Sequence, residues 1–255
     1  MTRITACVLQ KGGTGKSTTS HALSAGLTSR GFKVLTIDLD PQGNLSYSMR
    51  ADTNERGLFE LLSGEPISDL IQKTQQGNII ASSSRLVGAD KVFIDFGMEY
   101  LLSEALTPIK NSYDYIIIDC PPQLGVLVIN ALVVATDIII PITSDIYAMQ
   151  GLSQLLSNIE KVRHRPNPGL RIDGILLTRY SGRSILSRDL KESIEAQATV
   201  MGTKLYKTII RESVSIREAQ TRRIDIFQYA PTSNPAIDYN NFISEYLNRG
   251  GGVSG

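Results

Sequence analysis

A short glycine-rich segment constrains this chain more than any other part of it. It reads Lys11-Gly12-Gly13-Thr14-Gly15-Lys16-Ser17-Thr18, follows an apolar run and precedes a helical pattern. Its glycines let the backbone turn tightly and direct N–H groups at phosphate oxygens, and the start of the following helix adds a positive dipole. Lys16 can reach the β- and γ-phosphates of a nucleotide, and the Ser17 hydroxyl can bind Mg²⁺. The segment therefore predicts a phosphate-binding loop.

The loop departs from the common pattern G-x-x-x-x-G-K-[ST] in two ways. Gln10 stands at the position of the first glycine, and Lys11 adds a second lysine five residues before Lys16. Lys11 lies on the strand side of the loop, where it cannot easily share the γ-phosphate of its own site. A second subunit facing the loop would bring this cation to the charge that develops during phosphoryl transfer, as an arginine finger does.

Short β-branched runs alternate with helical patterns along nearly the whole chain. We expect strands at residues 4–9, 33–37, 78–81, 115–118, 137–142, 172–178 and 205–209. We expect helices near residues 17–30, 57–62, 99–106, 125–135, 149–164, 187–201 and 235–247. Several strands are apolar on both faces, as central strands are when helices cover both sides of a sheet. The alternation predicts an α/β fold with a doubly wound, mostly parallel sheet and helices on both faces.

No linker, repeat or low-complexity segment divides the 255 residues. A chain of this length allows one large domain or two small ones. We expect a single domain at residues 1–248 and a flexible, glycine-rich tail at residues 249–255.

Acidic side chains follow two of the predicted strands. Asp38 and Asp40 end the second strand, and Asp119 ends the apolar run at residues 115–118. Carboxylates at the carboxyl ends of parallel strands lie beside a phosphate loop, where they can act on Mg²⁺ and water. The segment at Asp38 and Asp40 also fits an Asx-Pro-Gly turn that caps a strand, but such a turn does not need two aspartates.

Composition excludes several classes of protein. Cys7 and Cys120 are too few for a disulfide framework or a cysteine-rich zinc site, and both lie beside apolar runs, so we expect buried thiols. The N-terminus has no secretory signal. Asn130, Asp137 and Pro141 interrupt the most apolar stretch, residues 124–142, which divides into a helix and a strand. We therefore expect a cytoplasmic protein.

Together, the loop and the acidic segments resemble the deviant Walker A group of P-loop ATPases, which includes ParA, MinD and NifH. The resemblance covers nearly the whole chain, and the segments that follow Asp40, Cys120 and Tyr147 are similar to the ParA branch in order and spacing. It implies an enzyme that uses ATP and Mg²⁺ and hydrolyses ATP to ADP and phosphate.

The resemblance also implies roles for individual residues. Lys11 would reach the phosphates of the partner subunit in an ATP-sandwich homodimer, and Asp40 would position the attacking water. Ser17, Asp38 and Asp119 would hold Mg²⁺ and its water network. Gly12, Gly13, Thr14, Gly15, Lys16, Ser17 and Thr18 would bind the nucleotide with Lys11.

Four functions compete within this group. They are a ParA-type partition ATPase, a MinD-type membrane ATPase, a nitrogenase iron protein and a metabolic enzyme of the dethiobiotin synthetase kind. Residues 238–247 carry only Asp238 and Glu245 as charges, so they lack the basic face that anionic lipid attracts, and no membrane partner is expected. Neither cysteine lies in a loop suited to a shared iron–sulfur cluster. The partition ATPase is favoured; a positioning ATPase acting on a protein cluster or membrane-linked cargo is the alternative, and a metabolic enzyme comes third.

The distribution of charge bears on DNA. The whole chain carries 26 Lys and Arg against 25 Asp and Glu, a net charge of +1. Residues 183–223 carry nine Lys and Arg against five Asp and Glu, so this segment holds +4 and the remainder −3. Clustered cations give salt-sensitive affinity for DNA without sequence preference. The family carries DNA-contacting arginines in this third of the chain, and the candidates are Arg183, Arg211, Arg217, Arg222 and Arg223. The resemblance to this family also implies a ParB-like partner and ATP-dependent association with the nucleoid.

Overall fold

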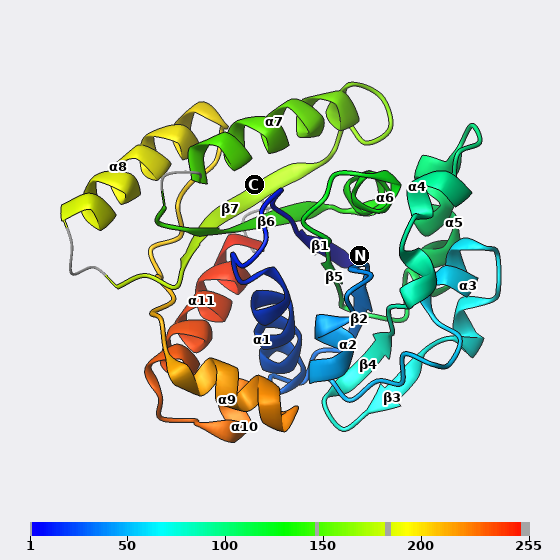
Figure 1. Cartoon of the computed structure of the whole chain (residues 1–255), viewed down its shortest axis with the longest axis horizontal. Coiled ribbons are helices and arrows are strands. Elements are labelled where there is room, and N and C mark those ends of the chain that lie inside the picture. The colour runs from blue at the N-terminus through cyan, green and yellow to red at the C-terminus, as the bar shows by residue number, and fades with distance from the viewer. Residues whose placement is uncertain (1, 146–147, 182–184, 251–255) are drawn as a thin grey trace.

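The computed structural model describes residues 2–145, 148–181 and 185–250. All named strands in these ranges form one sheet with the order β3-β4-β2-β5-β1-β6-β7 (Figure 1). The strands are β1 (Arg3–Cys7), β2 (Val34–Asp38), β3 (Gln72–Thr74), β4 (Gly77–Ile80), β5 (Tyr115–Asp119), β6 (Asp137–Thr143) and β7 (Arg171–Thr178). Every pairing is parallel except that of the short edge strand β3 with β4.

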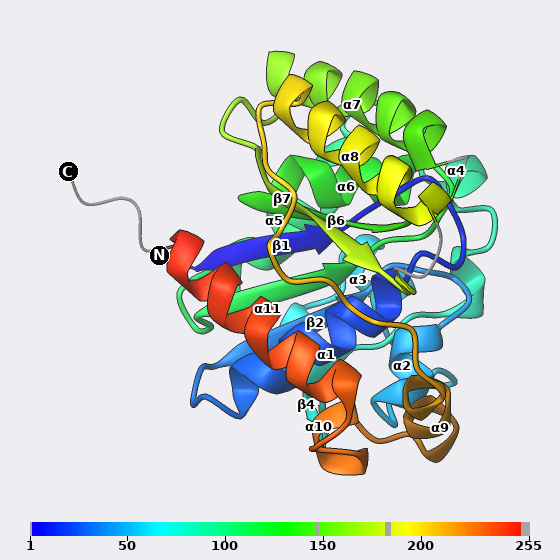
Figure 2. The ribbon, with the colours of Figure 1, turned by 90° about the vertical axis from the view of Figure 1, so that its left-hand side faces the viewer.

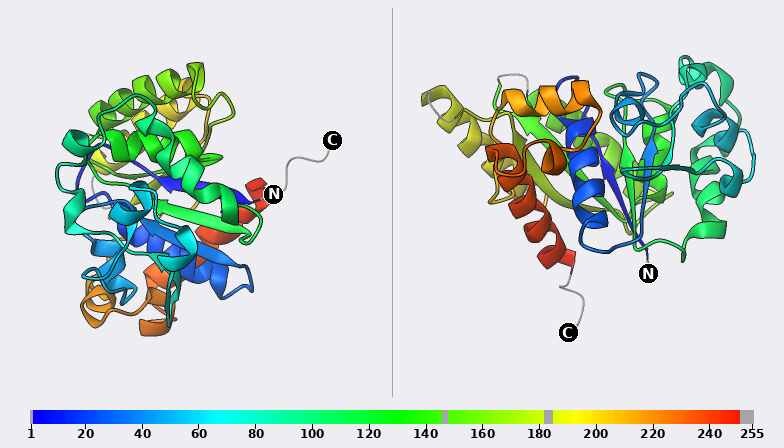
Figure 3. Two further views of the ribbon diagram at one scale, coloured as in Figure 1. Left: turned by 90° about the vertical axis from the view of Figure 1, so that its right-hand side faces the viewer. Right: turned by 90° about the horizontal axis from the view of Figure 1, so that it is seen from below.

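Helices cover both faces of the sheet (Figure 2). One side carries α3 (Leu58–Leu62), α5 (Leu101–Leu106), α6 (Val126–Val134), α7 (Ala148–His164) and α8 (Ile185–Val200). The other carries α1 (Lys16–Thr28), α9 (Val214–Arg222), α10 (Ile226–Tyr229) and α11 (Asn234–Gly250), with α11 beside α1 (Figure 3). The short helices α2 (Asn44–Ser48) and α4 (Ala89–Val92) follow β2 and β4 in the chain.

Alternate residues of the central strands build two separate cores. Ile116 and Ile118 of β5 pack under α5 and α6, whereas Ile117 between them packs against α1 and α11. The period of two along a strand produces this division. Strands buried on both faces explain the continuous apolar runs in the sequence, and the predicted doubly wound α/β fold is confirmed.

One predicted strand is wrong. Residues 205–209 run beside β7, but they form only an isolated bridge between Leu205 and Ile175. The Glu245 carboxylate of α11 accepts hydrogen bonds from the backbone N–H groups of Lys207 (2.9 Å) and Thr208 (3.0 Å). Because the Thr208 N–H bonds to Glu245, pairing with β7 is interrupted here and resumes at Ile210, whose N–H donates to the Leu177 carbonyl at 2.9 Å.

The sequence does not predict the short elements β3, α2, α4, α9 and α10, and the ends of several predicted elements shift by one to three residues. Helix α11 extends to Gly250, beyond its expected end at residue 247. The apolar stretch at residues 124–142 does divide into α6 and β6. No helix in the described ranges is both long and apolar enough to cross a bilayer.

A buried carboxylate joins three adjacent strands. Asp137 at the start of β6 is only 1% exposed, and it pairs with Arg3 of β1 and Arg171 of β7 at 2.9 Å each.

We predict that Asp137→Asn lowers the free energy of unfolding by about 3 kcal/mol, because it leaves the largely buried Arg3 with one carboxylate fewer. Arg171→Ala is the matched control: that side chain is 58% exposed, so its loss should cost less than about 1 kcal/mol. Equal losses in urea unfolding would contradict this assignment.

Candidate active site

The phosphate loop joins β1 to α1 in a left-handed conformation that glycine favours. Gly13 has φ 76° and Gly15 has φ 82°. The loop is fastened from β7, because Thr178 Oγ1 donates to the Thr14 carbonyl at 2.8 Å. Lys16 is 6% exposed, and its Nζ donates to the Lys11 carbonyl at 2.8 Å, so its ammonium group is directed along the loop.

A cleft of about 860 Å³ opens over this loop. Its walls come from the loop, from the segment that follows β2, and from α9 and α11. The lining includes Gly12, Gly13, Thr14, Gly15, Lys16, Ser17, Thr18, Asp40, Asn44, Arg217, Gln220 and Tyr239. The volume and the phosphate-binding loop at its floor suit a nucleotide.

Beneath the loop lie two fully buried aspartates. Asp38 and Asp119 end the adjacent strands β2 and β5, where they are direct partners in the parallel register, and each is 0% exposed. Burial raises the pKa of Asp38 to about 6, although Ser46 donates to this carboxylate through both its N–H (2.8 Å) and its hydroxyl (2.7 Å). Burial and the neighbouring Asp38 also raise the pKa of Asp119. Burial lowers the pKa of Lys16, so all three groups are costly to keep charged in isolation.

The acidic pair fits a bound cation. Oδ2 of Asp119 is buried and has no hydrogen-bond partner in the described ranges. Across those ranges, no three His, Cys, Asp or Glu side chains converge on a metal by themselves. Mg²⁺ keeps several waters and takes phosphate oxygens as ligands. Ser17 could therefore bind the ion directly, with Asp38 and Asp119 acting on its water shell.

Asp40 occupies a different place from Asp38. It is 7% exposed and lines the cleft, and its carboxylate accepts a hydrogen bond from the N–H of Gln42 at 3.0 Å. Its carbonyl accepts the Ser82 hydroxyl at 2.5 Å, from the segment after β4. Of Asp38 and Asp40, Asp40 is thus the one whose carboxylate can contact a nucleotide or water in the cleft.

The two lysines of the loop point to different partners. Lys16 stays within the loop, whereas the Lys11 ammonium forms an ion pair with Asp145, which follows β6. Lys11 is therefore held beside the loop rather than over it.

The candidate DNA-binding arginines that the structure describes have different surroundings. Arg183 lies outside the described residues. Arg211 pairs with Asp238 of α11, with Nη2 at 2.6 Å from Oδ1, and Arg217 lines the cleft over the phosphate loop. Arg222 is exposed, with its guanidinium 5.7 Å from the Tyr229 ring centroid, and Arg223 stacks 4.6 Å from the Tyr47 ring centroid.

Sequence reasoning missed the contacts that close the cleft from β7 and α9. Arg179 donates to the Gly13 carbonyl at 3.2 Å and pairs with Glu212 at 3.1 Å. Gln220 of α9 donates to Thr18 Oγ1 at 3.0 Å. Ser213, which caps α9 by accepting a bond from the Ser215 N–H, was the available signal for this helix.

Comparisons with known proteins identify the family of this chain. The family model described as an AAA domain matches residues 2–172. The chain is 37% identical over 240 residues to the chromosome-partitioning ATPase Soj of Thermus thermophilus, covering 94% of this chain and 93% of that protein.

Solved structures share the fold over the whole chain. A cobyrinic acid a,c-diamide synthase of Mycobacterium smegmatis, with a bound ATP analogue and magnesium, has a TM-score of 0.84 and 31% identity, covering 100% of this chain and 98% of that one. The ATP complex of Cyanothece McdA(D38A) has a TM-score of 0.86 and 23% identity, covering 97% and 96%, which shows the fold alone. The nucleotides and magnesium in these structures are the cofactors that the sequence predicts. With an identity of 37% across most of its length to a partitioning ATPase, the chain belongs to the Soj/ParA family of P-loop ATPases.

Proposed function

We propose that this ATPase binds ATP with Mg²⁺, closes into an ATP-sandwich dimer and binds DNA without sequence preference. A ParB-like partner then stimulates hydrolysis, and the cycle segregates a plasmid or a chromosome. The observation that supports the proposal is the different placement of the two lysines, with Lys16 directed along the loop and Lys11 paired with Asp145. We expect a lysine held beside the loop to reach the phosphates of a second subunit that faces it.

The proposed DNA contact uses the basic end of α9. Arg222 is exposed, and Arg50 lies beside it, with Nη2 donating to the Arg222 carbonyl at 3.1 Å. The ion pair with Asp238 makes Arg211 a weaker candidate, because a carboxylate already neutralises it. In the ATP-bound state the protein would reside on the nucleoid.

Two other functions remain as candidates. One is a positioning ATPase of the same family whose cargo is a protein cluster or is linked to a membrane. The likeness to a protein named as a synthase supports a small-molecule enzyme on this fold. A defined co-substrate that stimulates ATP turnover in the absence of DNA would favour the latter.

The site predicts different losses for two of its residues. Lys16→Ala should reduce ATP hydrolysis by at least about 100-fold, because it removes the cation that meets the β- and γ-phosphates. Asp40→Ala should keep ATP affinity and lose turnover, because the phosphate loop is intact but the water is not positioned. Asp189→Ala, an exposed aspartate of α8, should behave as wild type. Normal hydrolysis by Lys16→Ala would show that the site is assigned wrongly.

A cross-subunit role for Lys11 makes turnover depend on protein concentration. Specific ATPase activity of the wild type should rise with concentration, and Lys11→Ala should stay at a low, constant value. Lys33→Ala removes an exposed lysine between α1 and β2 and should keep the concentration dependence. The cross-subunit role fails if Lys11→Ala shows the same rise as the wild type.

DNA binding should require ATP and weaken as salt rises. Arg222→Ala should lower the affinity equally for unrelated DNA sequences and reduce the slope of log affinity against log salt by about one. Arg165→Ala, an exposed arginine between α7 and β7, should leave the slope unchanged. An ATP-loaded protein that ignores DNA at low salt would favour the positioning ATPase with a protein cargo.

A further inference from the structure

Two strained arginines face each other beside the active-site cleft. Across the described ranges, the non-glycine residues with positive φ are Arg50 (61°), Arg179 (51°) and Arg223 (56°). Arg50 follows the end of α2 and Arg223 follows the end of α9, at the positions where helices usually place glycine. A left-handed conformation is unfavourable for a residue with a Cβ, and hydrogen bonds from the two side chains offset this cost.

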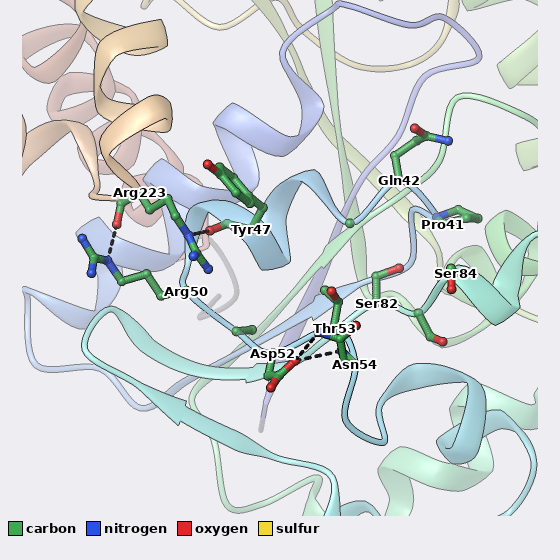
Figure 4. Close-up of a pocket in the computed structure, with 13 residues that line it drawn as sticks. Pro41, Gln42, Tyr47, Arg50, Asp52, Thr53, Asn54, Ser82, Ser84 and Arg223 are labelled. Carbon is green, nitrogen blue, oxygen red and sulfur yellow. Dashed lines mark hydrogen bonds between the residues drawn. The ribbon is translucent and has the colours of Figure 1, made fainter.

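The compensation is reciprocal, as the dashed lines in Figure 4 show. Arg50 Nε donates to the Arg223 carbonyl at 2.9 Å, and Arg223 Nε donates to the Tyr47 carbonyl at 2.7 Å. The Gln76 amide joins the two ends by donating to the carbonyls of Ser48 (2.9 Å) and Arg223 (3.2 Å). Each helix thus receives its last hydrogen bonds from a residue that ends the other helix.

Electrostatics explains why both residues are arginines. The carboxyl ends of α2 and α9 meet here, and each carries partial negative charge on its last carbonyl groups. Glycine would relieve the backbone strain but leave those charges facing each other. No carboxylate within the described ranges forms an ion pair with Arg50 or Arg223. We call this reciprocal arrangement of Arg50 and Arg223 the cross-cap.

The cross-cap sits between the two parts of the cleft that must stay aligned. At one end, α2 begins directly after the Asp40 loop (residues 40–43), and Ser46 of this helix donates to Asp38. At the other end, α9 lines the cleft and bonds to Thr18 through Gln220. The Asp40 loop has open space on its far side as well, where a pocket of about 680 Å³ lies between it and the cross-cap (Figure 4). The loop is held by the Ser82 hydroxyl on the Asp40 carbonyl and, at its carboxyl end, by α2.

We propose that Arg50 and Arg223 are positioning residues for ATP hydrolysis, because the cross-cap fixes α2 and hence the Asp40 loop relative to α9 and the phosphate loop. The inference rests on the proposed role of Asp40 in positioning water. It adds a connection between residues 50 and 223, which no local sequence pattern joins.

The test replaces each arginine with the residue that suits its backbone. Arg50→Gly and Arg223→Gly keep the left-handed conformation without strain and remove the whole side chain with its guanidinium, which for Arg223 includes its contact with the Tyr47 ring. Each should lower kcat for ATP by about tenfold through displacement of the loop, while KM changes by less than about twofold because the phosphate loop is intact. The double variant should be no worse than either single variant, since the pair acts as one unit. Arg56→Gly, which loses an exposed ion pair with Glu65, should match the wild type.

Hydrogen exchange gives a second readout that does not depend on Asp40. Amides of residues 44–49 should exchange faster in both glycine variants and not in Arg56→Gly. Unchanged kcat in both variants, unchanged exchange, or losses that multiply in the double variant would overturn the proposal. If Asp40→Ala keeps its turnover while the glycine variants lose theirs and exchange faster, then the role of Asp40 fails and the cross-cap stands as a determinant of turnover by another route.

Discussion

The rest of the site depends on the burial of Asp38 and Asp119 side by side beneath the phosphate loop. Both carboxylates are 0% exposed and are register partners on β2 and β5. Burial raises the pKa of both carboxylates, and the neighbouring Asp38 adds to the rise at Asp119. Lys16 faces the converse problem, because burial lowers its pKa. A bound Mg²⁺ with a nucleotide supplies charges of both signs, so the same burial that is unfavourable in the free protein favours the loaded one.

The fold holds this acidic pair through hydrogen bonds from elements that would otherwise be independent. Ser46 of α2 bonds to Asp38, and Ser20 of α1 bonds to Asp119 at 3.2 Å. A change in charge at Asp38 or Asp119 therefore acts on the hydrogen bond between Asp38 and Ser46 of α2, the helix that follows the Asp40 loop. This connection makes α2 a natural element to respond to the nucleotide, and the cross-cap joins it to α9.

Much of the site could be predicted because its residues are close in the sequence. The phosphate loop is one segment between a strand and a helix, and the aspartates end strands whose apolar runs are unmistakable. The remaining features need contacts between distant residues. Arg211 with Asp238, Arg179 with Glu212 and Arg50 with Arg223 each join different elements. No local pattern distinguishes an arginine that will be paired from one that stays exposed, so the basic segment predicted a binding surface that the fold partly neutralises. The strand expected at residues 205–209 failed for a similar reason, because the Thr208 N–H bonds to the distant Glu245 of α11 and not to β7.

Under the proposed function, ATP, and not ADP, brings two subunits together over the phosphate loops. The most direct measurement is the molar mass of the wild-type protein in solution, by light scattering during gel filtration, without nucleotide, with ADP and Mg²⁺, and with ATP and Mg²⁺. We predict the mass of one chain in the first two conditions and of two chains in the third. The same mass in all three conditions, or a dimer with ADP, would contradict the claim.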